Sequence, residues 1–202
     1  MVMNLEKVNK LLMDHEKLGG NLAVMYPLLK DRIDGIYEDT EVPFKEEFLF
    51  FENKYLEIKK HMLENGITGD ILDIGCQFGF QSELFLDCNS YTGVDVAKHR
   101  FFNQDKEHVQ YIIGNFPNNV TLPLEDSVVC SVMSIGYFNN YIHPDNEVAL
   151  ARIVEQYKKI KHLYISTTEE LVEQLEPHFS IKECLLESRA GHSRFNVYYM
   201  GK

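Results

Sequence analysis

Apolar side chains recur at steps of three and four along the first third of the chain. Leu5, Val8, Leu11 and Leu12 place one apolar face on a helix over residues 5–18, which Gly19 ends. A second apolar stripe predicts a helix that begins at Pro43 and is capped by Gly66. This stripe comprises Phe44, Phe48, Phe51, Tyr55, Ile58 and Met62. Residues 21–42 read as a short helix and a loop, so residues 1–65 form a helical cap or lid.

From about residue 70 the pattern changes to short apolar runs that alternate with amphipathic segments. The predicted strands are 71–74, 91–95, 109–113, 127–135, 163–167, 181–187 and 195–200, and the predicted helices are 81–88, 97–106, 145–159 and 169–178. Alternation of this kind predicts an α/β fold with a doubly wound, mostly parallel seven-stranded sheet. The last two strands have only a short connection, which predicts a terminal antiparallel hairpin. Residues 66–202 therefore form one Rossmann-like core after the N-terminal helical extension.

Charge and composition narrow the classes of partner. The formal net charge is −11, which disfavours a nucleic-acid acceptor, and the basic clusters 98–100 and 158–161 are interpreted as solvated helix faces. The N-terminus lacks the apolar core of a signal peptide, and no apolar run approaches the ~20 residues of a membrane span, which favours the cytoplasm and no membrane partner. The four cysteines are far apart, which predicts free thiols. Histidines and acids show no ligand spacing, so no metal is expected.

The strongest chemical signal is the segment from Asp73 to Gly79, between an apolar strand and an amphipathic segment. Gly75 permits a tight turn and close approach of a ligand, and Gly79 would let backbone N–H groups reach an anion. A strand-to-helix turn without a ligand explains the glycines equally well. Asp95 ends the next strand, where a carboxylate can accept both hydroxyls of a ribose. A helix-capping aspartate is the alternative, but loop and acid together favour an adenosine-containing ligand.

These residues resemble the first motif of the class I S-adenosylmethionine-dependent methyltransferases, an acid followed by Gly-x-Gly-x-Gly. Asp73, Gly75 and Gly79 are in register, whereas Gln77 replaces the middle glycine. The resemblance covers roughly residues 66–202 and implies S-adenosylmethionine as cofactor, with its methionine moiety against the 73–79 loop and its ribose on Asp95. Gln77 either hydrogen-bonds the amino or carboxylate group of the cofactor or marks a degenerate site.

The resemblance also implies an adenine site after the third strand and an acceptor site after the fourth. Asn115 would read the exocyclic amine and Phe116 would pack on the ring, the alternatives being a loop asparagine and a core phenylalanine. In the stretch 134–144, Ser134 would contribute to the cofactor site and Tyr137 and Tyr141 to pocket walls. His143 would be a general base or, alternatively, only the residue before a helix start.

The sequence thus predicts a methyltransferase whose acceptor is a small molecule in preference to a protein. The 134–144 stretch lacks the Asp/Asn-Pro-Pro-aromatic tetrapeptide and the Pro-Cys nucleophile of DNA-methylating enzymes. A catalytically silent methyltransferase-like module is the second hypothesis. A nicotinamide-dependent oxidoreductase is a distant third, because the chain lacks the Gly-x-Gly-x-x-Gly spacing.

Overall fold

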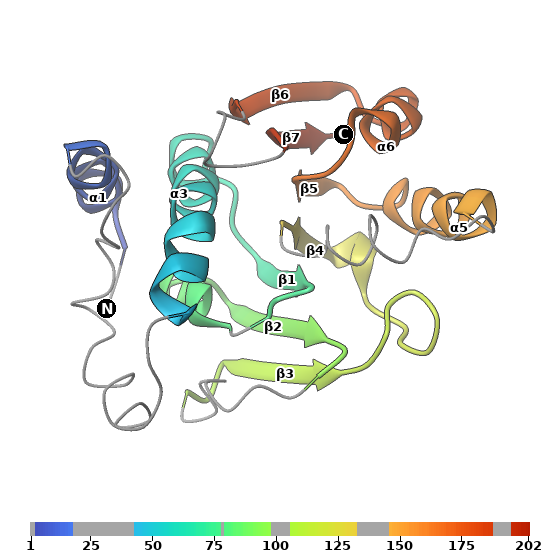
Figure 1. Ribbon diagram of the computed structural model, residues 1–202, viewed down its shortest axis with the longest axis horizontal. Helices are drawn as coiled ribbons and strands as arrows, with labels where there is room; N and C mark the ends of the chain where they lie inside the picture. The colour runs from blue at the N-terminus through green and yellow to red at the C-terminus, as the bar shows by residue number, and fades with distance from the viewer. Residues whose placement is uncertain (1–2, 18–42, 78, 98–105, 133–145, 188–194) are drawn as a thin grey trace.

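A single twisted sheet organises the molecule in the computed structural model, which describes residues 3–17, 43–77, 79–97, 106–132, 146–187 and 195–202 (Figure 1). Its strands are β1 (Asp70–Ile74), β2 (Ser90–Asp95), β3 (Val109–Ile113), β4 (Ser127–Ser131), β5 (His162–Ile165), β6 (Ile181–Leu186) and β7 (Val197–Gly201). Their order is β3-β2-β1-β4-β5-β7-β6. The first five strands are parallel, and β7 is antiparallel to both β5 and β6. The predicted sheet and terminal antiparallel hairpin are confirmed.

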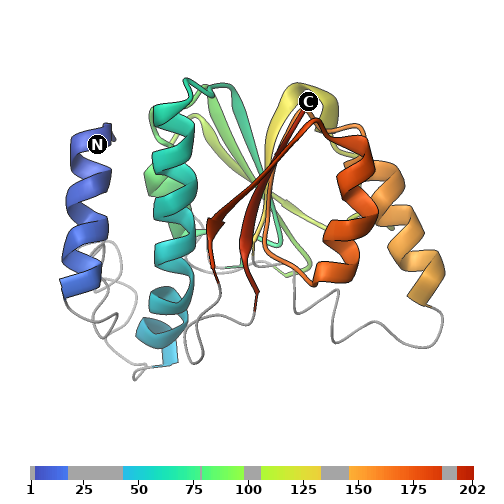
Figure 2. The ribbon, with the colours of Figure 1, turned by 90° about the horizontal axis from the view of Figure 1, so that it is seen from above.

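Helices cover both faces of this sheet, as the predicted doubly wound class requires. They are α1 (Leu5–Lys17), α3 (Pro43–Glu64), α5 (Asn146–Tyr157) and α6 (Glu169–Leu175), with 3₁₀ turns η1 (Phe80–Phe85), η2 (Leu124–Asp126) and η3 (Glu176–His178). Figure 2 shows α3 on one face, with α1 against its outer side, and α5 and α6 on the other face. Each face has its own buried apolar cluster.

The second half of helix α3 follows its predicted apolar pattern, and the side chains of Phe44, Phe48 and Phe51 lie outside the described ones. Tyr55, Ile58 and Met62 are all at most 2% exposed and pack in the same cluster as sheet residues. Gly66 adopts a left-handed φ of 63°, and the Ile67 N–H donates to the Met62 carbonyl at 2.9 Å. This is a glycine-capped helix end of the predicted kind. Because α3 shares its core cluster with the sheet, it covers the sheet directly; a domain boundary at residues 65/66 stays a prediction.

Two predicted helices end differently from the sequence expectation. The segment predicted as a helix over 81–88 is the 3₁₀ turn η1, which begins after Gly79 and ends at Phe85. Gly79 has a left-handed φ of 72°, and its carbonyl accepts the Ser82 N–H at 3.2 Å, so the turn closes with 3₁₀ spacing. Helix α6 likewise ends at Leu175 and passes into η3. Strand β4 ends at Ser131, and most of the predicted helix over 97–106 lies outside the described residues.

Two further expectations from composition can be compared with the structure. All four cysteines are free thiols, and Cys76 and Cys130 are buried. Within the described ranges, no helix combines the length and apolarity that a membrane crossing would require.

Candidate functional site

The loop between β1 and η1 is held in a conformation that glycine favours at two of its positions. Gly75 and Gly79 have φ values of 73° and 72°, and Gln77 between them has 45°. At Gly79 a Cβ atom would lie only 2.6 Å from the Tyr111 ring. The Tyr111 hydroxyl donates to the Gly79 carbonyl at 3.2 Å, so β3 supports the loop from below. The glycine spacing is therefore required by backbone conformation and by packing, whether or not a ligand binds.

The backbone N–H groups of the loop are used within the chain. Those of Gly75 and Cys76 donate to the Val94 carbonyl at 2.8 and 3.1 Å, and that of Gly79 donates to Cys76 at 2.9 Å. The Gln77 N–H donates to Asp95 Oδ2 at 2.8 Å. These four groups are occupied by acceptors of the chain itself. The expectation that N–H groups at the start of the next segment reach an anionic group of a ligand stays a prediction.

Asp73, the acid of the motif, lies beneath the loop and is fully buried. Tyr91 Oη and Gln81 Nε2 each donate to its Oδ2 at 2.6 Å, and Tyr55 Oη donates to Oδ1 at 2.9 Å. Burial raises the pKa of Asp73 to about 6, against the opposing effect of the three hydrogen bonds. The carboxyl group thereby joins α3, η1 and β2 to β1. Its predicted role toward a cofactor is untested, but its structural role is evident.

The three donors to Asp73 were not singled out from the sequence. Tyr55 and Tyr91 occupy buried positions of an apolar stripe and an apolar strand, and Gln81 opens the following turn. A buried phenol normally finds a hydrogen-bond partner, and Asp73 is the one acid within the apolar run of β1. That combination was a usable signal, although it does not say which phenol pairs with which acid.

Asp95 stands at the carboxyl end of β2, beside the loop. Its Oδ2 accepts the Gln77 N–H, and its Oδ1 accepts the Ala97 N–H at 3.3 Å. The second contact is the turn-capping geometry considered as the alternative role. A carboxylate has about four acceptor positions, so these backbone contacts are compatible with hydroxyl donors from a ribose. The structure thus brings Asp95 and the 73–79 loop together, as predicted.

Two exposed apolar side chains flank Asp95. Val96 follows Asp95 in the chain and is 60% exposed. Ile113, which pairs in register with Asp95 on β3, is 47% exposed. Large apolar side chains at this level of exposure, at the ligand-binding edge of a parallel sheet, are available to pack on a flat apolar group. The sequence analysis did not identify this pair.

The two predicted adenine contacts, Asn115 and Phe116, lie in different surroundings in the segment after β3. Asn115 lies in a turn where its Oδ1 accepts the Asn118 side-chain amide at 3.3 Å and its N–H donates to Asn119 Oδ1 at 2.6 Å. Phe116 is 7% exposed, packs in the core cluster of the α5 face, and stacks on Tyr157 at 6.2 Å between centroids. These are the contacts of a loop asparagine and a core phenylalanine. Their roles toward adenine stay predictions.

Gln77 combines two unfavourable features. It is a residue other than glycine in the left-handed region, and its Oε1 is buried with no hydrogen-bond partner among the described residues. A non-glycine residue in this conformation costs about 1–2 kcal/mol, and a buried unpaired carbonyl about 1–3 kcal/mol. Such costs concentrate at functional sites. The departure from the family motif is therefore also the most strained described position of the loop.

The predicted acceptor side is only partly described. Ser134, Tyr137, Tyr141 and His143 lie outside the described residues. Near the carboxyl end of β5, Lys54 of α3 is 1% exposed and donates to Ser166 Oγ at 2.9 Å. Burial lowers the pKa of Lys54 to about 8. A buried lysine is rare, and the sequence, where it reads as a polar position on a helix, did not indicate it.

Among the described residues, no group of three or more His, Cys, Asp or Glu side chains could hold a metal ion.

Comparison with known proteins identifies the type of fold. No family model matches the chain, and no curated protein matches it in sequence. Among solved structures, the N-methyltransferase NodS from Bradyrhizobium japonicum, in complex with S-adenosyl-L-homocysteine, has a TM-score of 0.55 at 14% identity. That similarity covers 87% of this chain and 96% of NodS. The bifunctional kinase-methyltransferase WbdD has a TM-score of 0.50 at 13% identity, over 86% of this chain and 46% of WbdD.

These similarities agree with the strand order and the antiparallel β7. The chain has the fold of the class I S-adenosylmethionine-dependent methyltransferases, as the residues of the first motif predicted.

Proposed function

We propose that this protein binds S-adenosylmethionine at the carboxyl edge of β1 and β2 and transfers its methyl group to a small molecule in the cytoplasm. The observation that carries the proposal is the junction of Asp95 with the motif loop through the 2.8 Å Gln77 contact. The exposed Val96 and Ile113 beside that carboxylate support it. The carboxylate acceptor and the apolar surface beside it together suit a ribose that carries a flat base.

Each residue has a distinct role in this proposal. Asp95 accepts the ribose hydroxyls, Val96 and Ile113 pack on the adenine, and Asn115 reads its amine. The loop from Gly75 to Gly79 borders the methionine moiety. S-adenosylmethionine supplies a methyl group on a cationic sulfur, so the protein mainly has to hold donor and acceptor in line. Ser134, Tyr137, Tyr141 and His143 remain proposed residues of the cofactor and acceptor sites.

The test is calorimetric titration with S-adenosylhomocysteine, NAD and NADP. We expect micromolar binding of S-adenosylhomocysteine and, at about 100 times its Kd, about 2.7 kcal/mol of added stability. Asp95→Ala should weaken this binding roughly tenfold to a thousandfold, since charge-assisted hydrogen bonds contribute about 1.5–3 kcal/mol each. Asp126→Ala, which removes the same charge at the opposite edge, should leave affinity unchanged. Binding of NAD alone would refute the proposal.

A catalytically silent module is the second candidate, and Gln77 is the observation that favours it. If the Gln77 side chain blocks the methionine moiety, the wild type would not bind S-adenosylhomocysteine whereas Gln77→Gly would. Binding by the wild type, followed by transfer of a radiolabelled methyl group to a small-molecule fraction of cell extract, would instead establish the enzyme.

A further inference from the structure

A hollow lies at the opposite edge of the sheet from the candidate cofactor site. It has a volume of about 610 Å³ and is bordered by residues at the amino ends of β4 and β5 and the end of β7. Lys161 immediately precedes β5, and Lys202 follows β7, which runs antiparallel to it. Strands of five residues separate the two edges by about 15 Å. A ligand here would not touch Asp95 or the 73–79 loop.

Positive charge gathers around this hollow although the chain as a whole has a net charge of −11. Its lining consists of Lys158, Lys159, Lys161, Lys202, His178, Glu125 and Asp126. Four ammonium groups and two carboxylates therefore border the hollow. Lys158 pairs with Glu155 at 2.7 Å, outside the hollow. In the described ranges, Lys159, Lys161 and Lys202 have no ion pair.

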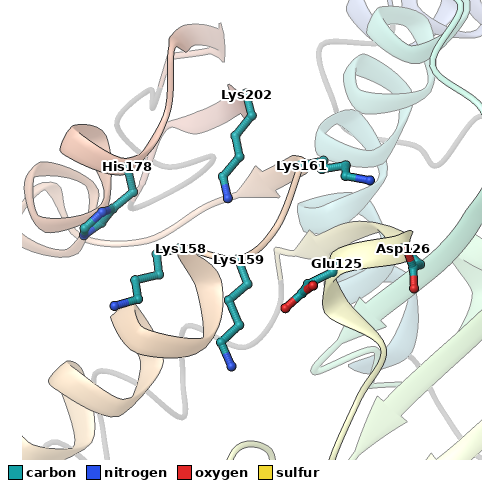
Figure 3. A pocket seen from close by; sticks show the side chains of 7 residues that line it. All are labelled: Glu125, Asp126, Lys158, Lys159, Lys161, His178 and Lys202. Atoms are coloured by element: carbon teal, nitrogen blue, oxygen red, sulfur yellow. The ribbon is translucent and has the colours of Figure 1, made fainter.

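The fold fixes the positions of these lysines around the hollow, and in the close-up their side chains extend in different directions (Figure 3). The Lys202 N–H donates to the Lys161 carbonyl at 3.1 Å, so the β5–β7 pairing fixes the two lysines as neighbours. The close-up shows the Lys202 side chain extending toward the end of α5, which carries Lys158 and Lys159 (Figure 3). The partial negative charge of a helix C-terminus accounts for the latter two lysines. It does not account for Lys161 and Lys202, which flank strands β5 and β7.

The lining is also asymmetric in chemistry. Glu125 and Asp126 form η2 with Leu124 and are exposed acceptors on the wall beside β4. An anion with no other polar group would be attracted by the lysines and repelled by this wall. A ligand that carries an anionic end and hydroxyl donors satisfies both walls. The volume is in the range of small-molecule sites, about 300–1,000 Å³.

We propose that this hollow is a binding site for a small phosphate monoester of a polyol, with the phosphate on Lys159, Lys161 and Lys202. The hydroxyl groups donate to Glu125 and Asp126. Lysine ammonium groups bind phosphate as point charges, and a phosphate monoester carries about −1.5 to −2 charges at neutral pH. The cluster 158–161, first read from the sequence as a solvated helix face, thus forms part of a second site, independent of the proposed methyl transfer.

The test is titration of the full chain with glucose 6-phosphate, inorganic phosphate and glucose, followed by calorimetry and amide chemical shifts. We expect a Kd on the order of 0.1–1 mM for glucose 6-phosphate, as suits an exposed site, and weakening by added salt. Inorganic phosphate should bind more weakly, because it makes no use of the acidic wall, and glucose should not bind. The shifted amides should belong to the hollow.

Matched variants decide whether the lysines form a site. A triple variant with Lys159, Lys161 and Lys202 changed to Ala should raise the Kd at least tenfold. A control with Lys10, Lys17 and Lys106 changed to Ala loses the same charge elsewhere and should keep the wild-type Kd. Circular dichroism checks that both variants are folded. Equal weakening in both triples would mean non-specific attraction and would overturn the proposal.

A second pair of variants tests the acidic wall. Changing Glu125 to Gln and Asp126 to Asn should abolish the preference for glucose 6-phosphate over inorganic phosphate. Three results would refute the site. They are a failure of glucose 6-phosphate to saturate the protein at about ten times its expected Kd, an unchanged preference in this variant, or displacement of S-adenosylhomocysteine by the sugar phosphate. The last would place binding at the other edge of the sheet.

Discussion

Replacing Gln77 by glycine should stabilise the protein, and the magnitude follows from its two unfavourable features. A glycine at φ 45° avoids the left-handed penalty of about 1–2 kcal/mol. It also removes the buried, unpartnered Oε1, which costs about 1–3 kcal/mol. Against this, glycine makes the unfolded chain more flexible, which costs about 0.4–1 kcal/mol. The loss of side-chain packing offsets a further part of the gain in stability.

Gln77→Ala is the matched comparison, because it removes the amide but keeps a Cβ in the left-handed region. Both variants retain the Gln77 backbone N–H that binds Asp95, so that contact is the same in both. The difference between Gly and Ala therefore isolates the backbone conformation. We expect the glycine variant to be more stable than the alanine variant by about 1 kcal/mol, which corresponds to roughly 2–4 °C in melting temperature.

Urea denaturation followed by circular dichroism measures both free energies of unfolding. The reasoning fails if the alanine variant is as stable as the glycine variant, since residue 77 would then not be in the left-handed region. If alanine is no more stable than the wild type, the buried amide oxygen has a partner or contributes packing that offsets its cost. Titration of the same two variants with S-adenosylhomocysteine separates these folding effects from a direct role of the amide in binding.

Three further predictions concern the supports of the site. Gly93→Ala should destabilise by about 1–3 kcal/mol in urea denaturation, because the added Cβ would lie 2.7 Å from the Tyr111 ring. Since burial raises the pKa of Asp73 to about 6, the folded state holds its proton longer than the unfolded state. The Asp73 contribution to stability should therefore fall by about 3 kcal/mol as pH rises from about 4 to 6, and Asp73→Asn should remove this dependence. Burial lowers the pKa of Lys54 to about 8, so its contribution should rise between about pH 8 and 10.5; the difference between wild type and Lys54→Met in pH-dependent unfolding measures it.

The fold could be predicted where the apolar period of a segment and the residues that end it agree. The α3 stripe with its Gly66 cap and the apolar runs of the strands identified these elements, and their alternation predicted the parallel sheet. Prediction failed where one backbone torsion decides the geometry. The left-handed Gly79 makes the following segment a 3₁₀ turn, and no apolar period distinguishes such a turn from a short helix.

For the site, the sequence was sufficient to predict which strand ends lie together. Asp95 and the 73–79 loop are together because consecutive parallel strands end at one edge. Contacts across the core were not predictable, because they depend on how α3 lies over the sheet. The Lys54–Ser166 hydrogen bond joins residues 112 positions apart, and the hollow beside Lys161 and Lys202 joins four separate segments.

The motif residues alone do not distinguish an enzyme from a silent module. Asp73 is fully buried and holds three side-chain donors, and Gly79 is required by its torsion and by Tyr111, so selection for folding would retain both. Val96 and Ile113 are different. Val96 is 60% exposed and Ile113 is 47% exposed, so each offers apolar surface that folding leaves open and that a bound adenine would cover. Val96→Ser should therefore weaken S-adenosylhomocysteine binding by about tenfold or less while leaving urea stability unchanged within about 0.5 kcal/mol. A loss of stability without a loss of affinity would assign the pair to the fold and favour the silent module.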